Sequence, residues 1–124
     1  MTAAKNSLIL IVEDDPTSNL LYSSFLESKG FRVISVTDGK DAIEAVKASP
    51  DISLILMDIR LPYLDGISTM KEIKTMNRAI PIIAQTAYAM VDDKRKLLHA
   101  GFDNYLAKPV KPDRLYELLL SYLE

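Results

Sequence analysis

Short apolar stretches recur along the chain, and each is separated from the next by a longer segment of mixed polar and apolar residues. The stretches lie at residues 8–12, 33–36, 54–57, 80–84 and 105–107. Their length is typical of buried strands, and the segments between them are long enough for helices. This alternation predicts a parallel sheet with helical crossovers. The stretches at 8–12 and 54–57 are apolar throughout, which predicts strands in the middle of the sheet.

Residues that favour the starts and ends of helices mark the boundaries of the intervening segments. Asp15 is a predicted N-cap before Pro16, and Gly30 is placed to end that helix. Asp38 is a second predicted N-cap, and Pro112 opens the last helix. Apolar residues in that helix follow the spacing of a face that packs on a sheet, namely Leu115, Leu118, Leu119, Tyr122 and Leu123.

The segment 91–100 is a less well supported helix than the others, because it has few apolar residues. A charged run from Asp92 to Lys96 leaves only Met90, Leu97 and Leu98 as candidate anchors. We therefore predict a loosely held helix, one that is able to move.

The size and composition of the chain predict one compact domain. Its 124 residues are 48% hydrophobic, and the formal net charge of -2 disfavours a surface made for nucleic acid. The absence of cysteine excludes disulfides, zinc–thiolate sites and thiol nucleophiles. Its apolar stretches are too short to span a membrane, so a cytoplasmic location is expected. We expect one domain over residues 1–124, with its core at about 7–123.

Polar residues with reactive side chains directly follow four of the apolar stretches. Because the carboxyl ends of parallel strands meet at one edge of a sheet, these residues are expected to lie close together. They are Glu13, Asp14 and Asp15 after the first stretch, Asp58 after the third, Gln85 and Thr86 after the fourth, and Lys108 after the fifth.

Carboxylates that gather at one edge repel each other, by roughly 4 kcal/mol for a pair 4 Å apart at an effective dielectric constant near 20. Mg²⁺ would offset this repulsion and suits an oxygen ligand set better than zinc. Asp15 already has a task as a helix cap, so Glu13 and Asp14 are the predicted metal ligands. Beside a metal and Lys108, Asp58 is equipped to attack phosphorus and form an acyl phosphate, with the Thr86 hydroxyl donating to a phosphoryl oxygen.

Four segments of the chain resemble the receiver domains of two-component response regulators, in order and in spacing. They read LILIVEDDP, LILMDIRLPYLDG, PIIAQTAYA and AGFDNYLAKP. The likeness spans almost the whole chain.

This resemblance implies a doubly wound α/β fold of the flavodoxin-like type, with a five-stranded parallel sheet of order 2-1-3-4-5. It implies that Asp58 accepts a phosphoryl group, that Lys108 contacts the phosphate and that Pro109 follows a cis peptide bond. It also implies a Mg²⁺ site, which Mn²⁺ could occupy instead, formed by Glu13, Asp14, Asp58 and the backbone carbonyl of Arg60.

By the same resemblance, Thr86 and Tyr105 form a switch pair, in which the hydroxyl moves toward the phosphate and the ring turns inward. The surface of the fourth helix, fifth strand and fifth helix then changes, and a downstream protein reads that change. The phosphodonor would be a sensor histidine kinase or a histidine phosphotransfer protein. Arg60 and Tyr88 would flank the phosphate and influence the lifetime of the phosphorylated form.

Other functions remain open at this point. The chain could be a pseudo-receiver that binds partners without phosphorylation, or a receiver excised from a hybrid histidine kinase. An aspartyl-phosphate phosphatase or mutase would require an acid two residues after the nucleophile, where this chain has Arg60. A flavin carrier would not place three acids at its phosphate loop. We expect a phosphoacceptor switch with self-catalysed phosphotransfer and autodephosphorylation rather than an enzyme.

Overall fold

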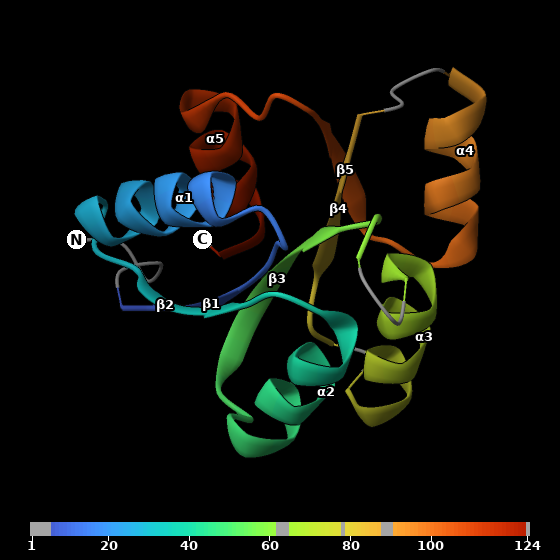
Figure 1. The fold of residues 1–124 in the computed structure, drawn as a ribbon, viewed down its shortest axis with the longest axis horizontal. Coiled ribbons are helices and arrows are strands. Elements are labelled where there is room, and N and C mark those ends of the chain that lie inside the picture. The colour runs from blue at the N-terminus through green and yellow to red at the C-terminus, as the bar shows by residue number, and fades with distance from the viewer. Residues whose placement is uncertain (1–5, 62–64, 78, 88–90, 124) are drawn as a thin grey trace.

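The computed structural model describes residues 6–61, 65–77, 79–87 and 91–123, with the side chains of 91–93 excepted. Within these ranges, strands and helices alternate along the chain (Figure 1). The elements are β1 (Leu8–Val12), α1 (Pro16–Ser28), β2 (Arg32–Val36), α2 (Gly39–Ala48), β3 (Ile52–Asp58), α3 (Gly66–Met76), β4 (Ile82–Thr86), α4 (Val91–Ala100), β5 (Asn104–Ala107) and α5 (Pro112–Leu123).

The strands form one parallel sheet in the order β2-β1-β3-β4-β5. This confirms the predicted fold class and strand order. The continuously apolar stretches 8–12 and 54–57 lie in β1 and β3, and both strands are inside the sheet, as predicted.

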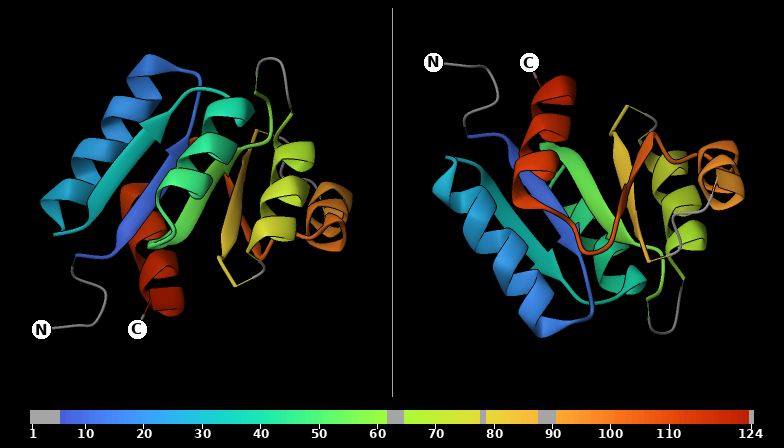
Figure 2. Two further views of the ribbon diagram at one scale, coloured as in Figure 1. Left: turned by 90° about the horizontal axis from the view of Figure 1, so that it is seen from below. Right: turned by 90° about the horizontal axis from the view of Figure 1, so that it is seen from above.

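Helices cover both faces of the sheet and bury a separate hydrophobic core on each (Figure 2). One core joins β-strand residues to α1 and α5, through side chains such as Leu26 and Leu119. The other core joins the opposite face of the strands to α2, α3 and α4, through side chains such as Val46, Ile73 and Leu97. The predicted packing of the last helix on the sheet is confirmed by the burial of Leu115, Leu118 and Leu119.

The predicted caps position the helices. The Asp15 carboxylate accepts a hydrogen bond from the Ser18 backbone N–H at 3.0 Å, and the Asp38 carboxylate accepts one from that of Asp41 at 2.8 Å. The last helix begins at Pro112 as predicted. Glycines with positive φ follow two of the helices, Gly30 after α1 and Gly101 after α4.

Two details differ from the sequence-based expectation. The fourth strand runs over Ile82–Thr86 rather than 80–84. It starts later because Pro81 has no N–H to donate and the Ile82 N–H is held by the Asp103 carboxylate at 2.8 Å, and it ends later because Gln85 and Thr86 pair with β5. In α4, Leu97 is buried but Leu98 is 45% exposed, so the prediction of Leu98 as an anchor was wrong. The third candidate, Met90, lies outside the described residues. No helix in the described part of the chain has the length and apolar character that a bilayer crossing needs.

Candidate functional site

Three acids converge at the carboxyl ends of β1 and β3, which are neighbouring inner strands of the sheet. Glu13 and Asp14 follow β1, and Asp58 is the last residue of β3. One carboxylate oxygen of each lies within 4.8 Å of the other two. Glu13 and Asp58 are buried, whereas Asp14 is exposed. The structure thus brings the predicted acids together, and we refer to Glu13, Asp14 and Asp58 as the acidic centre.

Lys108 supplies a positive charge to the acidic centre. Its Nζ lies 2.6 Å from Asp58 Oδ2 and 3.4 Å from Glu13 Oε1. Since Lys108 follows the edge strand β5, its side chain must cross β4 to reach Asp58 on β3. Burial by itself would lower the pKa of Lys108, but the hydrogen bond and charge of Asp58, aided by Glu13, outweigh it and raise the pKa. Lys108 therefore remains an ammonium group. The peptide bond between Lys108 and Pro109 is cis, which confirms that prediction.

The second oxygen of Asp58 is also held. Asp58 Oδ1 accepts a hydrogen bond from the backbone N–H of Arg60 at 2.9 Å. The start of α3 packs closely behind this turn, because a Cβ at Gly66 would lie 2.6 Å from the backbone oxygen of Asp58. Glycine is therefore required here for close approach. The role of the Arg60 backbone carbonyl as a metal ligand stays a prediction.

Glu13 is fully buried beside another carboxylate, which is an unfavourable place for a negative charge. Burial, aided by the charge of Asp58, raises the pKa of Glu13 from 4.5 to about 7, against the lowering effects of a hydrogen bond from the Asp15 backbone N–H and of the Lys108 charge. That N–H lies 3.1 Å from Glu13 Oε2, while Oε1 accepts no hydrogen bond. Asp15 itself caps α1 through Ser18, as predicted, and is not a member of the acidic centre.

These features fit a divalent cation with a preference for oxygen. The acidic centre contains three carboxylates against one ammonium group, and a buried carboxylate oxygen of Glu13 is left without a hydrogen bond. Mg²⁺ binds through one or two carboxylates together with water, and the exposed Asp14 leaves the centre open to solvent on one side. The donor set therefore suits Mg²⁺.

Comparison with known proteins identifies the family. The model of the response regulator receiver domain matches residues 9–120. The chain belongs to this family. The receiver is 41% identical over 116 residues to the signal transduction histidine-protein kinase BarA of Shigella flexneri, covering 92% of this chain and 12% of that protein. The chain thus spans only a small part of the curated relatives it matches.

Solved receiver domains share the fold over nearly the whole chain. The receiver domain of the Francisella response regulator 1452 matches with a TM-score of 0.89 at 29% identity, covering 95% of this chain and 97% of that one. The receiver domain of the sensor histidine kinase PA1611 of Pseudomonas aeruginosa PAO1 matches with a TM-score of 0.82 at 41% identity, covering 95% and 98%. That structure has a magnesium ion coordinated in its active-site cleft.

The two predicted switch residues of the receiver lie on neighbouring strands. Thr86 ends β4 and is buried, and Tyr105 on β5 is half-buried against the core that β4 shares with α2, α3 and α4. Tyr105 pairs with Ala84 in the strand register, so its side chain emerges on the same face of the sheet as Ala84 and Thr86. Their switching role stays a prediction, and Tyr88 lies outside the described residues.

Gln85 is a buried polar residue of the receiver, predicted to lie at this edge of the sheet but without a predicted chemical role. It pairs with Asp58 in the register of β3 and β4, it is fully buried, and neither its Nε2 nor its Oε1 has a hydrogen-bond partner. The alternation along β4 places Gln85 on the same face as Ile83, which is a core residue. That period-two pattern was the available signal for its burial.

Proposed function

We propose that the receiver is a phosphorylation switch in which Asp58 accepts a phosphoryl group from the phosphohistidine of a sensor kinase or histidine phosphotransfer protein. The observation that carries this proposal is the position of Asp58. Its buried carboxylate lies 2.6 Å from the Lys108 ammonium and within 4.8 Å of the carboxylates of Glu13 and Asp14. Membership of the receiver family supports the same role.

The proposed reaction is a transfer of one phosphoryl group. An oxygen of the Asp58 carboxylate forms a bond to phosphorus while the N–P bond of the donor breaks, and the electron pair of that bond stays on the imidazole. Lys108 then moves its hydrogen bonds from the carboxylate to the phosphoryl oxygens, and the Thr86 hydroxyl donates to another of them. The backbone N–H of Arg60 holds the second oxygen of Asp58 throughout, which keeps the nucleophile oriented.

The acidic centre would hold a magnesium ion through Glu13, Asp14 and Asp58, with the Arg60 backbone carbonyl as a further ligand. When bound, Mg²⁺ supplies positive charge that favours a phosphoryl group beside three carboxylates. Mn²⁺ prefers similar oxygen ligands and would substitute.

Slow self-catalysed dephosphorylation, rather than multiple turnover, would return the receiver to its resting state. Turnover of phosphomonoesters requires a general acid for the leaving group, and the residue two positions after Asp58 is Arg60. The complete set of three acids and Lys108 also disfavours a pseudo-receiver.

Both partners of the switch would be proteins. The helix α1, which begins two residues after Asp14 of the acidic centre, exposes the apolar side chains of Leu20 and Leu21, at 69% and 55%, and these offer a contact for the phosphodonor. The matched part of BarA lies within a histidine kinase, which supports a hybrid kinase as one source of the phosphoryl group. On the output side, movement of Thr86 and Tyr105 would alter the face of α4, β5 and α5, where a downstream protein binds.

The proposal predicts a specific pattern of phosphorylation. After incubation with acetyl phosphate and Mg²⁺, wild type should gain one phosphoryl group in intact-mass measurements, and Asp58→Asn should gain none. Asp41→Asn, which changes an exposed aspartate on α2, is the matched control and should react like wild type. Stoichiometric labelling of folded Asp58→Asn would place the acceptor elsewhere and refute the proposal.

The role of Lys108 is to couple phosphorylation to a change in partner affinity, and a substitution of Lys108 tests it. Lys108→Ala should retain the fold, because the lysine side chain joins no hydrophobic core, and should lose the change in partner affinity that follows phosphorylation. An equal change in partner affinity in wild type and this variant would rule out the coupling role.

A further inference from the structure

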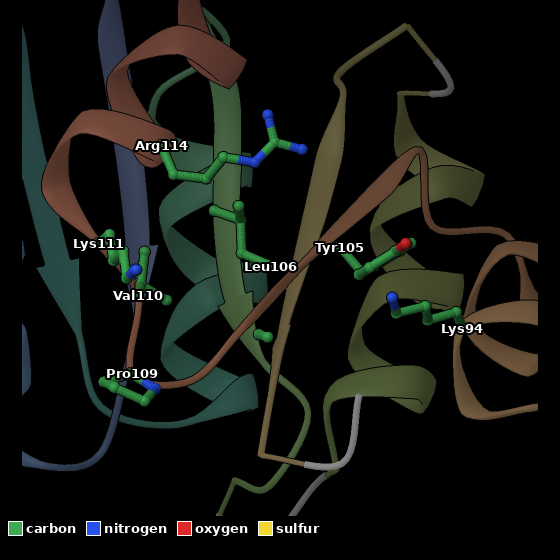
Figure 3. A pocket seen from close by; sticks show the side chains of 8 residues that line it. Lys94, Tyr105, Leu106, Pro109, Val110, Lys111 and Arg114 are labelled. Carbon is green, nitrogen blue, oxygen red and sulfur yellow. The ribbon is translucent and has the colours of Figure 1, made fainter. Parts of the chain in front are cut away.

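A groove runs between α4 and α5 above the edge strand β5 (Figure 3). It has a volume of about 310 Å³, and Lys94, Tyr105 and Arg114 are among the residues that line it. Figure 3 shows the Lys94 side chain extending from α4 toward the ring of Tyr105 on β5.

The contact between Lys94 and Tyr105 is a cation–π interaction. Lys94 Nζ lies 5.1 Å from the centroid of the Tyr105 ring, within the distance at which an ammonium group is attracted to the face of an aromatic ring. Both side chains are half-buried, so the interaction is partly shielded from water. The ring is thus held on the groove side of β5 by a charge that belongs to α4.

The contact between Lys94 and Tyr105 matters because α4 has few buried side chains. Among the α4 side chains that the structure describes, only Leu97 is buried, and Leu98 is 45% exposed. The contact between Lys94 and Tyr105 therefore adds to the burial of Leu97 and the partial burial of Ala100 in attaching α4 to the rest of the domain. An inward turn of the Tyr105 ring would break its cation–π contact with Lys94.

We propose that Lys94 is a positioning residue that restrains the switch by stabilising the outward ring of Tyr105. This inference rests on the proposed function of Asp58 and of the pair of Thr86 and Tyr105. In this proposal the protein reacts with the phosphodonor mainly when the ring is turned inward. A residue that stabilises the outward ring then lowers the population of the reactive state and with it the rate of phosphorylation. Removal of the Lys94 charge should therefore make Asp58 easier to phosphorylate.

The test measures the rate at which the full chain acquires a phosphoryl group from acetyl phosphate with Mg²⁺. Lys94→Met keeps the length of the side chain but removes its charge, and it should raise the rate roughly two- to fivefold, as expected for a partly exposed cation–π contact. Lys94→Arg retains a cation and should restore the wild-type rate. Lys96→Met removes an exposed positive charge from the same helix. It is the control for a change in rate that arises only from weaker attraction between the protein and the anionic acetyl phosphate.

A double-mutant cycle separates restraint of Tyr105 from a general effect of charge. In a Tyr105→Leu background there is no ring to hold, so Lys94→Met should leave the phosphorylation rate unchanged. In wild type with fluorinated tyrosines, the ¹⁹F resonance of Tyr105 should shift on phosphorylation. In unphosphorylated Lys94→Met, that resonance should move part of the way to the phosphorylated position.

Several results would overturn the inference alone. They are a wild-type rate for Lys94→Met, an equal increase for Lys96→Met, or an increase that persists in the Tyr105→Leu background. Absence of any phosphoryl group on wild type would instead refute the proposed function and, with it, the restraint.

Discussion

The strands β1 and β3, which position Glu13 and Asp58, lie inside the sheet, whereas β5, which carries Tyr105, forms its edge. All five residues of β1 are buried, but in β5 only Leu106 is. The helices beside β5 also differ, since α5 buries three leucines and the described side chains of α4 include only one that is buried, Leu97. We call α4 and β5 the α4–β5 region.

This difference in packing suits the two tasks of a switch, which are to carry out the phosphorylation chemistry and to report it to a partner. Chemistry at the acidic centre requires groups that stay within fractions of an ångström of one another, which dense packing of the inner strands provides. Reporting requires an element with a small energy difference between two positions, and sparse burial provides that in the α4–β5 region.

The largest expected effect is on global stability. Leu56 on β3 and Leu97 on α4 are both buried leucines, at 0% and 4% exposed. Leu56→Ala should lower the free energy of unfolding by about 2–5 kcal/mol, because the inner strand cannot close the cavity. Leu97→Ala should cost less than about 2 kcal/mol, because α4 can relax or open locally.

Urea denaturation of the two variants checks this difference. Hydrogen exchange should in addition show faster exchange confined to α4 in Leu97→Ala. Equal losses of global stability would mean that the α4–β5 region is as firmly packed as the acidic centre.

The second expected effect is a pH dependence that arises from Glu13. Its pKa is raised from 4.5 to about 7 by burial, so the folded state favours the protonated form. The associated stability is fully present below pH 4.5 and is lost as the pH rises through about 7. Without metal, the free energy of unfolding of Glu13→Gln should therefore rise relative to that of wild type by on the order of 3 kcal/mol as the pH increases from 4 to 8.

Paired urea titrations across this pH range, with a chelator present, measure the effect. A constant difference between wild type and Glu13→Gln would show that Glu13 titrates normally and is not a strained member of the acidic centre.

A third effect follows from metal binding to the folded state. At ten times the dissociation constant, Mg²⁺ should raise the free energy of unfolding by about 1.4 kcal/mol. Asp14→Asn removes an exposed carboxylate of the acidic centre, so it should leave the metal-free stability nearly unchanged and reduce the response to Mg²⁺. Thermal denaturation at several concentrations of Mg²⁺ tests this. An identical response in both proteins, or none at millimolar Mg²⁺, would count against the site.

The smallest effect concerns Gln85, which lies on β4 between the acidic centre and the α4–β5 region. Its buried amide has no hydrogen-bond partner. Gln85→Leu removes this unsatisfied group at similar volume and should raise the free energy of unfolding by about 1 kcal/mol. Urea denaturation would show the gain, and a loss of stability would indicate that the amide has a partner in solution.

The sequence was sufficient to predict the fold because local patterns agreed with the global one. The apolar runs of β1 and β3 predicted two of the three inner strands, and Asp15, Asp38 and Pro112 marked helix starts that the structure confirms. The convergence of the acids with Lys108 followed from the parallel direction of the strands, since residues at the carboxyl ends of parallel strands share one edge. The strand order itself was predicted from the resemblance to receiver domains.

Other features depend on contacts that no local pattern records. The exposure of Leu98 and the burial of Leu97 depend on how α4 is rotated against the sheet. The contact between Lys94 and Tyr105 joins residues of different elements. The two-residue shift of β4 depends on the Asp103 carboxylate, which lies 21 positions from Ile82.

The central claim is that the acidic centre and Lys108 make Asp58 the nucleophile toward phosphorus. The most direct test is fragment mass spectrometry of the wild-type protein after reaction with acetyl phosphate, with Mg²⁺ and with a chelator. The account predicts one phosphoryl group, located on Asp58 and formed only when Mg²⁺ is present. A phosphoryl group on any other residue, or none with Mg²⁺, would contradict it.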